Sequence, residues 1–208
     1  MKKVIYFIGA YGCGKTTKVL SLRRKSKEKA RILTEDDYML TFLKMPDKFL
    51  RQQFYLFTMY YRLHKAIEEL LEDDKAEVLL VDGHPLLNLV YGRVFFEMYN
   101  GLTLNYLQLT EISKAHWHMN EFAKKTGIFE GLEQTLCYID LPFDVNMGMI
   151  YDRNRNGRYG NPEEIDEDFL LLIKRVLSSE ITYLSQMYRA SVVNINSIKE
   201  LDEYKPKI

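Results

Sequence analysis

The chain has 208 residues and a mass of 24.7 kDa, which suits one large domain or two small ones. Its 47% hydrophobic and 13% aromatic content is enough for a buried core, which excludes a disordered chain. The 29 Lys and Arg residues balance the 29 Asp and Glu residues. A net charge of zero argues against a protein that coats a nucleic-acid polymer, because such proteins carry a basic excess.

The sequence also argues against a membrane-spanning protein and against a metal site built from Cys and His. No stretch approaches the roughly 18 consecutive apolar residues of a membrane span, and glycines interrupt the short apolar run that opens the chain. We therefore expect a cytoplasmic protein that does not contact a membrane. Cys13 and Cys137 are too few for a disulfide framework, and His116 and His118 would lie on different faces of a helix.

Five short apolar runs predict strands. The first, at residues 4–8, is β-branched and aromatic, as is typical of a strand covered on both faces of a parallel sheet. Helical patterns separate the runs, which predicts an α/β fold with a doubly wound, five-stranded parallel sheet and helices on both faces. No repeat or linker interrupts the pattern, so we expect one domain over residues 1–208. The other predicted strands are at residues 31–33, 77–81, 136–139 and 192–195.

The longest helical pattern starts at Pro46-Asp47 and stops at Asp73-Asp74. Its apolar residues recur at helical spacing over about seven turns and predict one broad buried face. These residues are Phe49, Leu50, Phe54, Phe57, Tyr60, Tyr61, Leu63, Ile67, Leu70 and Leu71. Further helices are predicted near residues 86–99, 104–125, 145–154 and 167–189.

The segment after the first strand matches G-x-x-x-x-G-K-[ST] in full and precedes a helical pattern. Its glycines let backbone N–H groups point at phosphate oxygens, and the helix N-terminus adds its dipole. We expect Lys15 to reach the β- and γ-phosphates of ATP or GTP and the Thr16 hydroxyl to ligate Mg²⁺. The expected nucleotide-binding residues are Gly9, Ala10, Tyr11, Gly12, Cys13, Gly14, Lys15, Thr16 and Thr17.

Carboxylates follow two of the predicted strands. Asp82 ends the third strand, where an acid commonly orients Mg²⁺ or contacts a substrate hydroxyl, although it could also serve the turn at Gly83-His84-Pro85. Glu35, Asp36 and Asp37 follow the second strand. Each is a candidate general base for a hydroxyl acceptor, and Asp36 or Asp37 is equally a candidate helix cap.

Two more features point to ligand binding. Gln53 is expected on the apolar side of the long helix, where its amide either bonds within the core or faces a cleft that holds a polar ligand. Phe57 is a candidate for packing or for stacking on a base. Residues 153–158 carry three guanidinium groups among Asn and Gly. Such a segment either closes over phosphates or forms a basic surface loop.

Together these motifs resemble the deoxynucleoside kinase family, within the wider group that includes thymidylate kinases. Besides the phosphate loop, the resemblance lies in residues 47–63, 138–142, 150–155 and 165–183, and so covers most of the chain. It implies a P-loop kinase fold with an arginine-bearing lid at about residues 152–164. It also suggests a homodimer.

The resemblance implies roles for individual residues. Glu35 would take the proton from the sugar 5′-hydroxyl, and Gln53 would read the base. Arg153 and Arg155 match the two lid arginines that contact the ATP phosphates and assist catalysis with Lys15.

One part of the family pattern is missing. The Glu-Arg-Ser or Asp-Arg-Ser that follows the family's third strand appears here as Asp82-Gly83-His84. The acid is kept as a candidate ligand of Mg²⁺ or substrate, but the arginine is absent. Arg62 or Arg93 would have to compensate on the substrate side.

Three functions follow, in order of preference. The first is ATP- and Mg²⁺-dependent phosphorylation of the 5′-hydroxyl of a deoxynucleoside, in nucleotide salvage. The second is a thymidylate-like nucleoside monophosphate kinase, because Arg62-Leu63-His64 resembles the acceptor helix of those enzymes. The third is a non-catalytic P-loop module that binds ATP. All three take small-molecule nucleosides or nucleotides and no nucleic-acid polymer.

Overall fold

Strands and helices alternate through the computed structural model, which describes residues 1–34, 47–85, 87–98, 105–155 and 166–206. None of the described helices has the length and apolar character needed to cross a bilayer. In chain order the elements are β1 (Lys3–Gly9), α1 (Lys15–Ser26), the 3₁₀ helix η1 (Lys27–Lys29), β2 (Ala30–Leu33), α3 (Lys48–Glu72), β3 (Val78–Asp82), α4 (Leu87–Met98), α5 (Tyr106–Thr126), β4 (Glu133–Ile139), α6 (Phe143–Arg155), α7 (Glu167–Tyr188), β5 (Ser191–Ile195) and α8 (Ile198–Glu203).

The five strands form one sheet in the order β2-β3-β1-β4-β5, and every neighbouring pair is parallel. The predicted five-stranded parallel sheet is therefore confirmed. β1 lies at the centre, with Phe7 opposite Asp82 of β3 and Gly9 opposite Ile139 of β4. This register aligns the carboxyl ends of the three central strands at one edge of the sheet.

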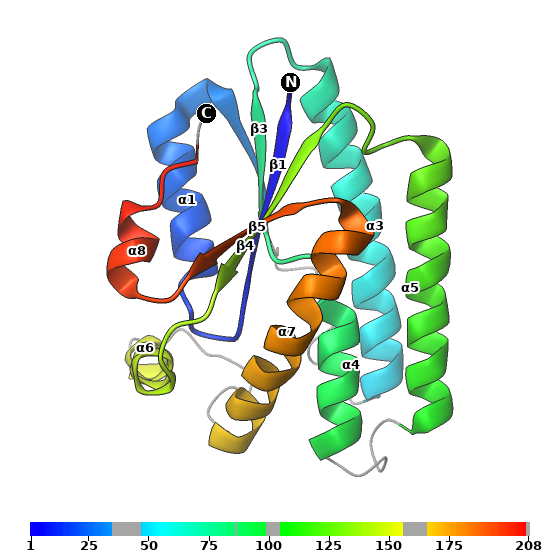
Figure 1. Cartoon of the computed structure of the whole chain (residues 1–208), viewed down its shortest axis with the longest axis vertical. Helices are drawn as coiled ribbons and strands as arrows, with labels where there is room; N and C mark the ends of the chain where they lie inside the picture. Colours follow the sequence, from blue (N-terminus) through cyan, green and yellow to red (C-terminus); the bar gives the residue numbers. More distant parts are fainter. Residues whose placement is uncertain (35–46, 86, 99–104, 156–165, 207–208) are drawn as a thin grey trace.

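Helices cover both faces of the sheet, because both faces of β1 are apolar (Figure 1). Val4, Tyr6 and Ile8 belong to the core beneath α3, α4, α5 and α7, and Ile5 and Phe7 belong to the core beneath α1 and α8. The sequence pattern did not predict α8, since six residues are too few to show a helical period.

The long helix α3 is confirmed, but its buried face is narrower than predicted. The Asp47 side chain caps it by accepting a hydrogen bond from the Leu50 backbone N–H at 2.9 Å. Five apolar residues expected in the core are 44% to 68% exposed, because α3 contacts the core along one side only. They are Leu50, Phe54, Phe57, Tyr61 and Leu71. The stripe that is fully buried includes Leu56, Tyr60, Leu63, Ile67 and Leu70.

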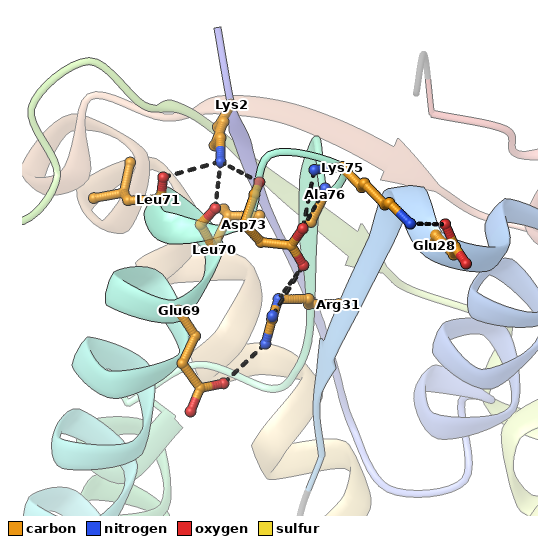
Figure 2. Close-up of polar contacts among 9 residues, drawn as sticks. All are labelled: Lys2, Glu28, Arg31, Glu69, Leu70, Leu71, Asp73, Lys75 and Ala76. Carbon is orange, nitrogen blue, oxygen red and sulfur yellow. Dashed lines mark hydrogen bonds and ion pairs between the residues drawn. The ribbon is translucent and has the colours of Figure 1, made fainter.

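A basic residue closes the carboxyl end of α3 (Figure 2). The Lys2 ammonium donates hydrogen bonds to the carbonyl oxygens of Leu70, Leu71 and Asp73, the last two at 3.1 and 2.7 Å. The last carbonyl groups of a helix lack partners within the helix, and the helix dipole favours a cation there. Lys2 therefore joins the start of β1 to the end of α3.

Asp73, which follows the last residue of α3, connects the end of this helix to β2 and to the segment before β3. Its carboxylate pairs with Arg31 at 2.9 Å and accepts hydrogen bonds from the backbone N–H groups of Lys75 and Ala76, as Figure 2 shows. Arg31 also pairs with Glu69 at 3.0 Å. The hydrogen bond from the Lys75 N–H, followed by that from Arg31, lowers the pKa of Asp73 below its ordinary value of 3.8. The ionised carboxylate is thus the form that the fold stabilises.

This network predicts a pH-dependent effect of Asp73→Asn. Because the folded-state pKa of Asp73 is lowered, its contribution to stability is present above pH 3.8 and is lost as the pH falls through the folded-state value. Asp73→Asn should lower the urea midpoint at pH 7, and its difference from the wild type should shrink at pH 3. Asp74→Asn is the matched control. An equal difference at both pH values would contradict this role of the charge.

Candidate functional site

The phosphate loop follows β1 and leads directly into α1. The Lys15 ammonium lies across the loop, where it donates hydrogen bonds to the carbonyl oxygens of Gly9 at 2.9 Å and Ala10 at 2.8 Å. Gly14 precedes the helix in a left-handed conformation with φ 85°. The predicted order of strand, glycine loop, lysine and helix is confirmed, and Lys15 is the first residue of α1.

Helix α6 packs against the same loop. At Gly12, φ is 66°, and an added Cβ would lie 2.4 Å from Cγ1 of Ile150, so only glycine fits at this position. The Asn146 side-chain amide donates a hydrogen bond to the Tyr11 carbonyl oxygen. The loop is therefore held by an element that begins more than 130 residues later in the chain.

The hydroxyl of Thr16 donates a hydrogen bond to a carboxylate oxygen of Asp82. Asp82 is buried at the end of β3, whereas Thr16 is exposed. Hydroxyl and carboxylate oxygens are ligands that suit Mg²⁺. The described part of the chain has no group of three or more His, Cys, Asp or Glu residues that could hold a metal ion. The two side chains could contribute two oxygen ligands to Mg²⁺, which stays a prediction.

The residue after Asp82, where the family pattern has an arginine, adopts a conformation that suits glycine. Gly83 has φ 95°, and its N–H donates to the Phe7 carbonyl oxygen at 2.9 Å. An added Cβ would lie 3.4 Å from Leu87 and 3.8 Å from the Tyr55 hydroxyl. The space would admit a side chain, but the left-handed backbone disfavours any residue other than glycine.

The first turns of α3 bury two polar residues that the sequence pattern did not single out. Arg51 is 5% exposed and Gln52 is 6% exposed, whereas Gln53 is half-buried. The Arg51 guanidinium carbon lies 5.3 Å from the ring centre of Phe95 on α4. Residues 51, 55 and 59 share one helix face, and Tyr55 and Met59 are buried. This helical spacing was the signal in the sequence that could have predicted the burial of Arg51.

The two arginines expected on the substrate side have different surroundings. Arg62 donates a hydrogen bond to the Thr34 carbonyl oxygen at 2.8 Å and so lies beside the end of β2. Arg93 pairs with Glu97 at 2.8 Å and with Glu180 at 2.9 Å, which links α4 to α7. Arg62 remains near the predicted site, whereas Arg93 serves a helix–helix contact.

One of the two arginines predicted for the lid lies on α6 near Tyr11. Arg153 on α6 is half-buried, and burial lowers its pKa while the nearby Tyr11 opposes that shift. Arg155 is the last residue of α6. Glu35 and the rest of the predicted lid beyond α6 lie outside the described residues, so their roles stay predictions.

His84, predicted only as a turn residue, belongs to the buried core. Its ring is fully buried, with ring centres 4.5 Å from Tyr6 and 4.6 Å from Tyr188. Burial, and then the nearby His116, lower the pKa of His84 well below its ordinary value. The turn after Asp82 is therefore packed on a neutral ring. On α5, His116 is buried and His118 is exposed, so the two do lie on different faces.

The backbone of this turn predicts the effect of Gly83→Ala. A left-handed φ costs an alanine about 1–2 kcal/mol, so the substitution should lower the free energy of unfolding by that amount. Urea denaturation measures the change. Gly148→Ala in α6, where an added Cβ meets nothing within 4 Å, is the control and should be neutral or stabilising. Wild-type stability of Gly83→Ala would contradict the conformation of the turn.

Comparisons with known proteins agree with this geometry. The AAA domain family matches residues 4–119, more than half of the chain. No curated protein sequence matches. A solved structure of deoxyadenosine kinase from M. mycoides, with the products dCMP and a flexible dCDP bound, is 14% identical, covers 96% of this chain and 95% of that chain, and gives a TM-score of 0.63. A second structure of that kinase, with dATP bound, is 16% identical with the same coverages and a TM-score of 0.56.

The fold and the family therefore agree. The parallel sheet, the phosphate loop and the helices on both faces form the P-loop kinase fold of those deoxyadenosine kinase structures, as the resemblance implied. The chain belongs to the AAA domain family of P-loop proteins.

Proposed function

We propose that this protein transfers the γ-phosphoryl group of ATP to the 5′-hydroxyl of a deoxynucleoside. The observation that carries the proposal is the hydrogen bond between Thr16 and Asp82. It joins the phosphate loop to the carboxyl end of β3, and ligands of open α/β sheets bind at this edge. Structures of the same fold with deoxynucleotides bound support an acceptor of this class.

The residues of the loop and of α6 supply positive charge for the transfer. Lys15 already lies across the loop, and Arg153 lies beside Tyr11 of the same loop. In the reaction, a bond forms between the acceptor oxygen and the γ-phosphorus as the bond to the β-phosphate oxygen breaks, which releases ADP. The hydroxyl proton passes to a carboxylate, a role that we assign to Glu35. Arg155 is assigned to the phosphates on the family resemblance.

Thr16 and Asp82 would hold Mg²⁺, because they place a hydroxyl and a carboxylate oxygen side by side at the phosphate loop. When bound, the ion would neutralise charge on the phosphate oxygens. In the structure, the hydroxyl proton of Thr16 lies between the Thr16 oxygen and the Asp82 carboxylate. Thr16 is exposed, so its side chain can turn toward a ligand.

The acceptor is assigned to the side of the sheet edge where α3 begins. Gln53 is half-buried and Phe57 is 49% exposed, and their spacing places both on the side of α3 opposite Tyr55, so a contact of either residue with the base rests on the family resemblance alone. A nucleoside monophosphate acceptor is the second candidate, and it is favoured by Arg62, whose guanidinium lies at the end of β2. A cation there suits an anionic acceptor better than a neutral hydroxyl.

The proposal predicts that Lys15→Ala abolishes most phosphoryl transfer. Loss of one preorganised charge at a phosphoryl group should lower kcat by at least about 100-fold. The measurement is transfer from labelled ATP, with Mg²⁺, to a panel of nucleosides and nucleoside monophosphates. Lys25→Ala, an exposed lysine on the same helix, is the matched control and should retain activity.

The panel also separates the candidate functions. The proposal is supported if nucleosides are converted to labelled nucleoside monophosphates. Labelling of the monophosphates alone would replace it with the second candidate. A wild-type protein that binds ATP and labels no acceptor would be a nucleotide-binding module.

A further inference from the structure

One side of helix α6 lies against the phosphate loop, beside the connection from β1 to α1 (Figure 1). A Cβ added to Gly12 would lie 2.4 Å from Cγ1 of Ile150 and 3.2 Å from Nδ2 of Asn146. A Cβ added to Gly14 would lie 3.4 Å from Cε of Met149. Residues 146, 149 and 150 are three and four positions apart, so they share one side of the helix. The contact between the helix and the loop therefore involves several residues of each.

Asn146 is a polar residue on this side of α6, and it is only 1% exposed. Its amide N–H donates a hydrogen bond to the Tyr11 carbonyl oxygen. Its Oδ1 atom is buried and has no hydrogen-bond partner among the residues that the structure describes. A buried polar atom without a partner destabilises a protein, and an apolar residue would avoid that cost. The asparagine therefore indicates a use for its N–H donor.

The hydrogen bond from Asn146 fixes the direction of the peptide unit between Tyr11 and Gly12. This peptide bond is trans, so its C=O and its N–H point in opposite directions. Because the Tyr11 carbonyl is directed to Asn146, the Gly12 N–H is directed away from α6. Phosphate loops bind their ligand through such N–H groups, and a carbonyl oxygen turned toward a phosphate would repel it.

Lys15 holds the two preceding carbonyl groups of the loop in a different way. Its ammonium donates hydrogen bonds to the carbonyl oxygens of Gly9 and Ala10. In the proposed reaction Lys15 turns to the phosphates of ATP and gives up these bonds. Asn146 belongs to another element and has no such second task. Its bond to the loop can therefore persist when the nucleotide binds.

The start of α6 is fixed to its surroundings independently of the loop. The Lys174 ammonium of α7 pairs with Asp140 and donates a hydrogen bond to the Leu141 carbonyl oxygen at 2.6 Å. The Asn146 backbone N–H donates to the Pro142 carbonyl oxygen at 2.9 Å. The backbone that carries the Asn146 side chain is thus held by α7 and by the first turn of its own helix.

We propose that Asn146 is a positioning residue for the phosphates of the nucleotide. Through the Tyr11 carbonyl, it holds the Gly12 N–H in the direction that a bound phosphate needs, so the loop does not have to reorganise when ATP binds. Asn146 acts through the backbone of the loop and donates no hydrogen bond to the substrate. The inference rests on the proposed use of ATP and adds a residue that sets the affinity for it.

Asn146→Ala and Asn146→Thr test this role, and Asn120→Ala, at a buried asparagine of α5, is the matched control. Titration calorimetry with Mg²⁺ measures the Kd of ATP and of inorganic triphosphate, which lacks the base and the sugar. A hydrogen bond contributes about 1 kcal/mol, which corresponds to a rise of about fivefold in Kd. Both Asn146 variants should show this rise by the same factor for the two ligands. The acceptor KM should stay within about twofold of the wild type.

Each outcome supports or overturns the inference. A rise for both ligands in the Asn146 variants, with Asn120→Ala at the wild-type affinity, supports it. An ATP Kd that stays within about twofold, a rise confined to ATP, or an equal rise in Asn120→Ala or in the acceptor KM overturns it.

The same experiment separates the inference from the proposed function. A wild-type protein that binds ATP and labels no acceptor overturns the proposed function, and the Kd values, measured without an acceptor, still decide the role of Asn146. A wild-type protein that binds neither ATP nor triphosphate overturns both. Thermal unfolding checks that each variant is folded, and if Asn146→Ala does not fold, the Kd values of Asn146→Thr decide.

Discussion

The register between β1 and β3 is the constraint on which the candidate site depends. Phe7 lies opposite Asp82, and the Gly83 N–H donates to the Phe7 carbonyl oxygen. This pairing ends β3 beside the phosphate loop, so the Thr16 hydroxyl reaches the carboxylate of Asp82. A shift of one residue would turn the Asp82 side chain to the opposite face of the sheet. Backbone pairing therefore sets the position of the candidate site, and the side chains supply its chemistry.

The two faces of the sheet supply different parts of the site. On one face, α1 extends from the phosphate loop and packs with α8, and an added Cβ on Gly14 would lie 3.2 Å from Leu201 of α8. On the other face, Phe95 of α4 packs on Phe169 of α7, and Phe169 stacks on Tyr11 of the phosphate loop. Segments from both ends of the chain thus support one short loop. In our proposal the nucleotide and the acceptor approach from these two sides.

The sequence predicted the phosphate loop and the sheet well, because both are local signals. A complete contiguous motif and five continuous apolar runs do not depend on how distant elements pack. The face of α3 was harder to predict, because aromatic residues such as Phe54 and Tyr61 fit a helical period yet lie 46% and 68% exposed. The burial of Arg51 was not predicted for the opposite reason, since a charged residue is expected at the surface. Only tertiary packing distinguishes these cases.

The most direct test of the central claim is a crystal structure of the protein with a non-hydrolysable ATP analogue, Mg²⁺ and a deoxynucleoside. We expect the terminal phosphate at Lys15 and Thr16, and the 5′-oxygen of the deoxynucleoside between Asp82 and the first turns of α3. An acceptor bound elsewhere, or a phosphate loop that does not hold the triphosphate, would contradict the claim that this edge of the sheet transfers a phosphoryl group.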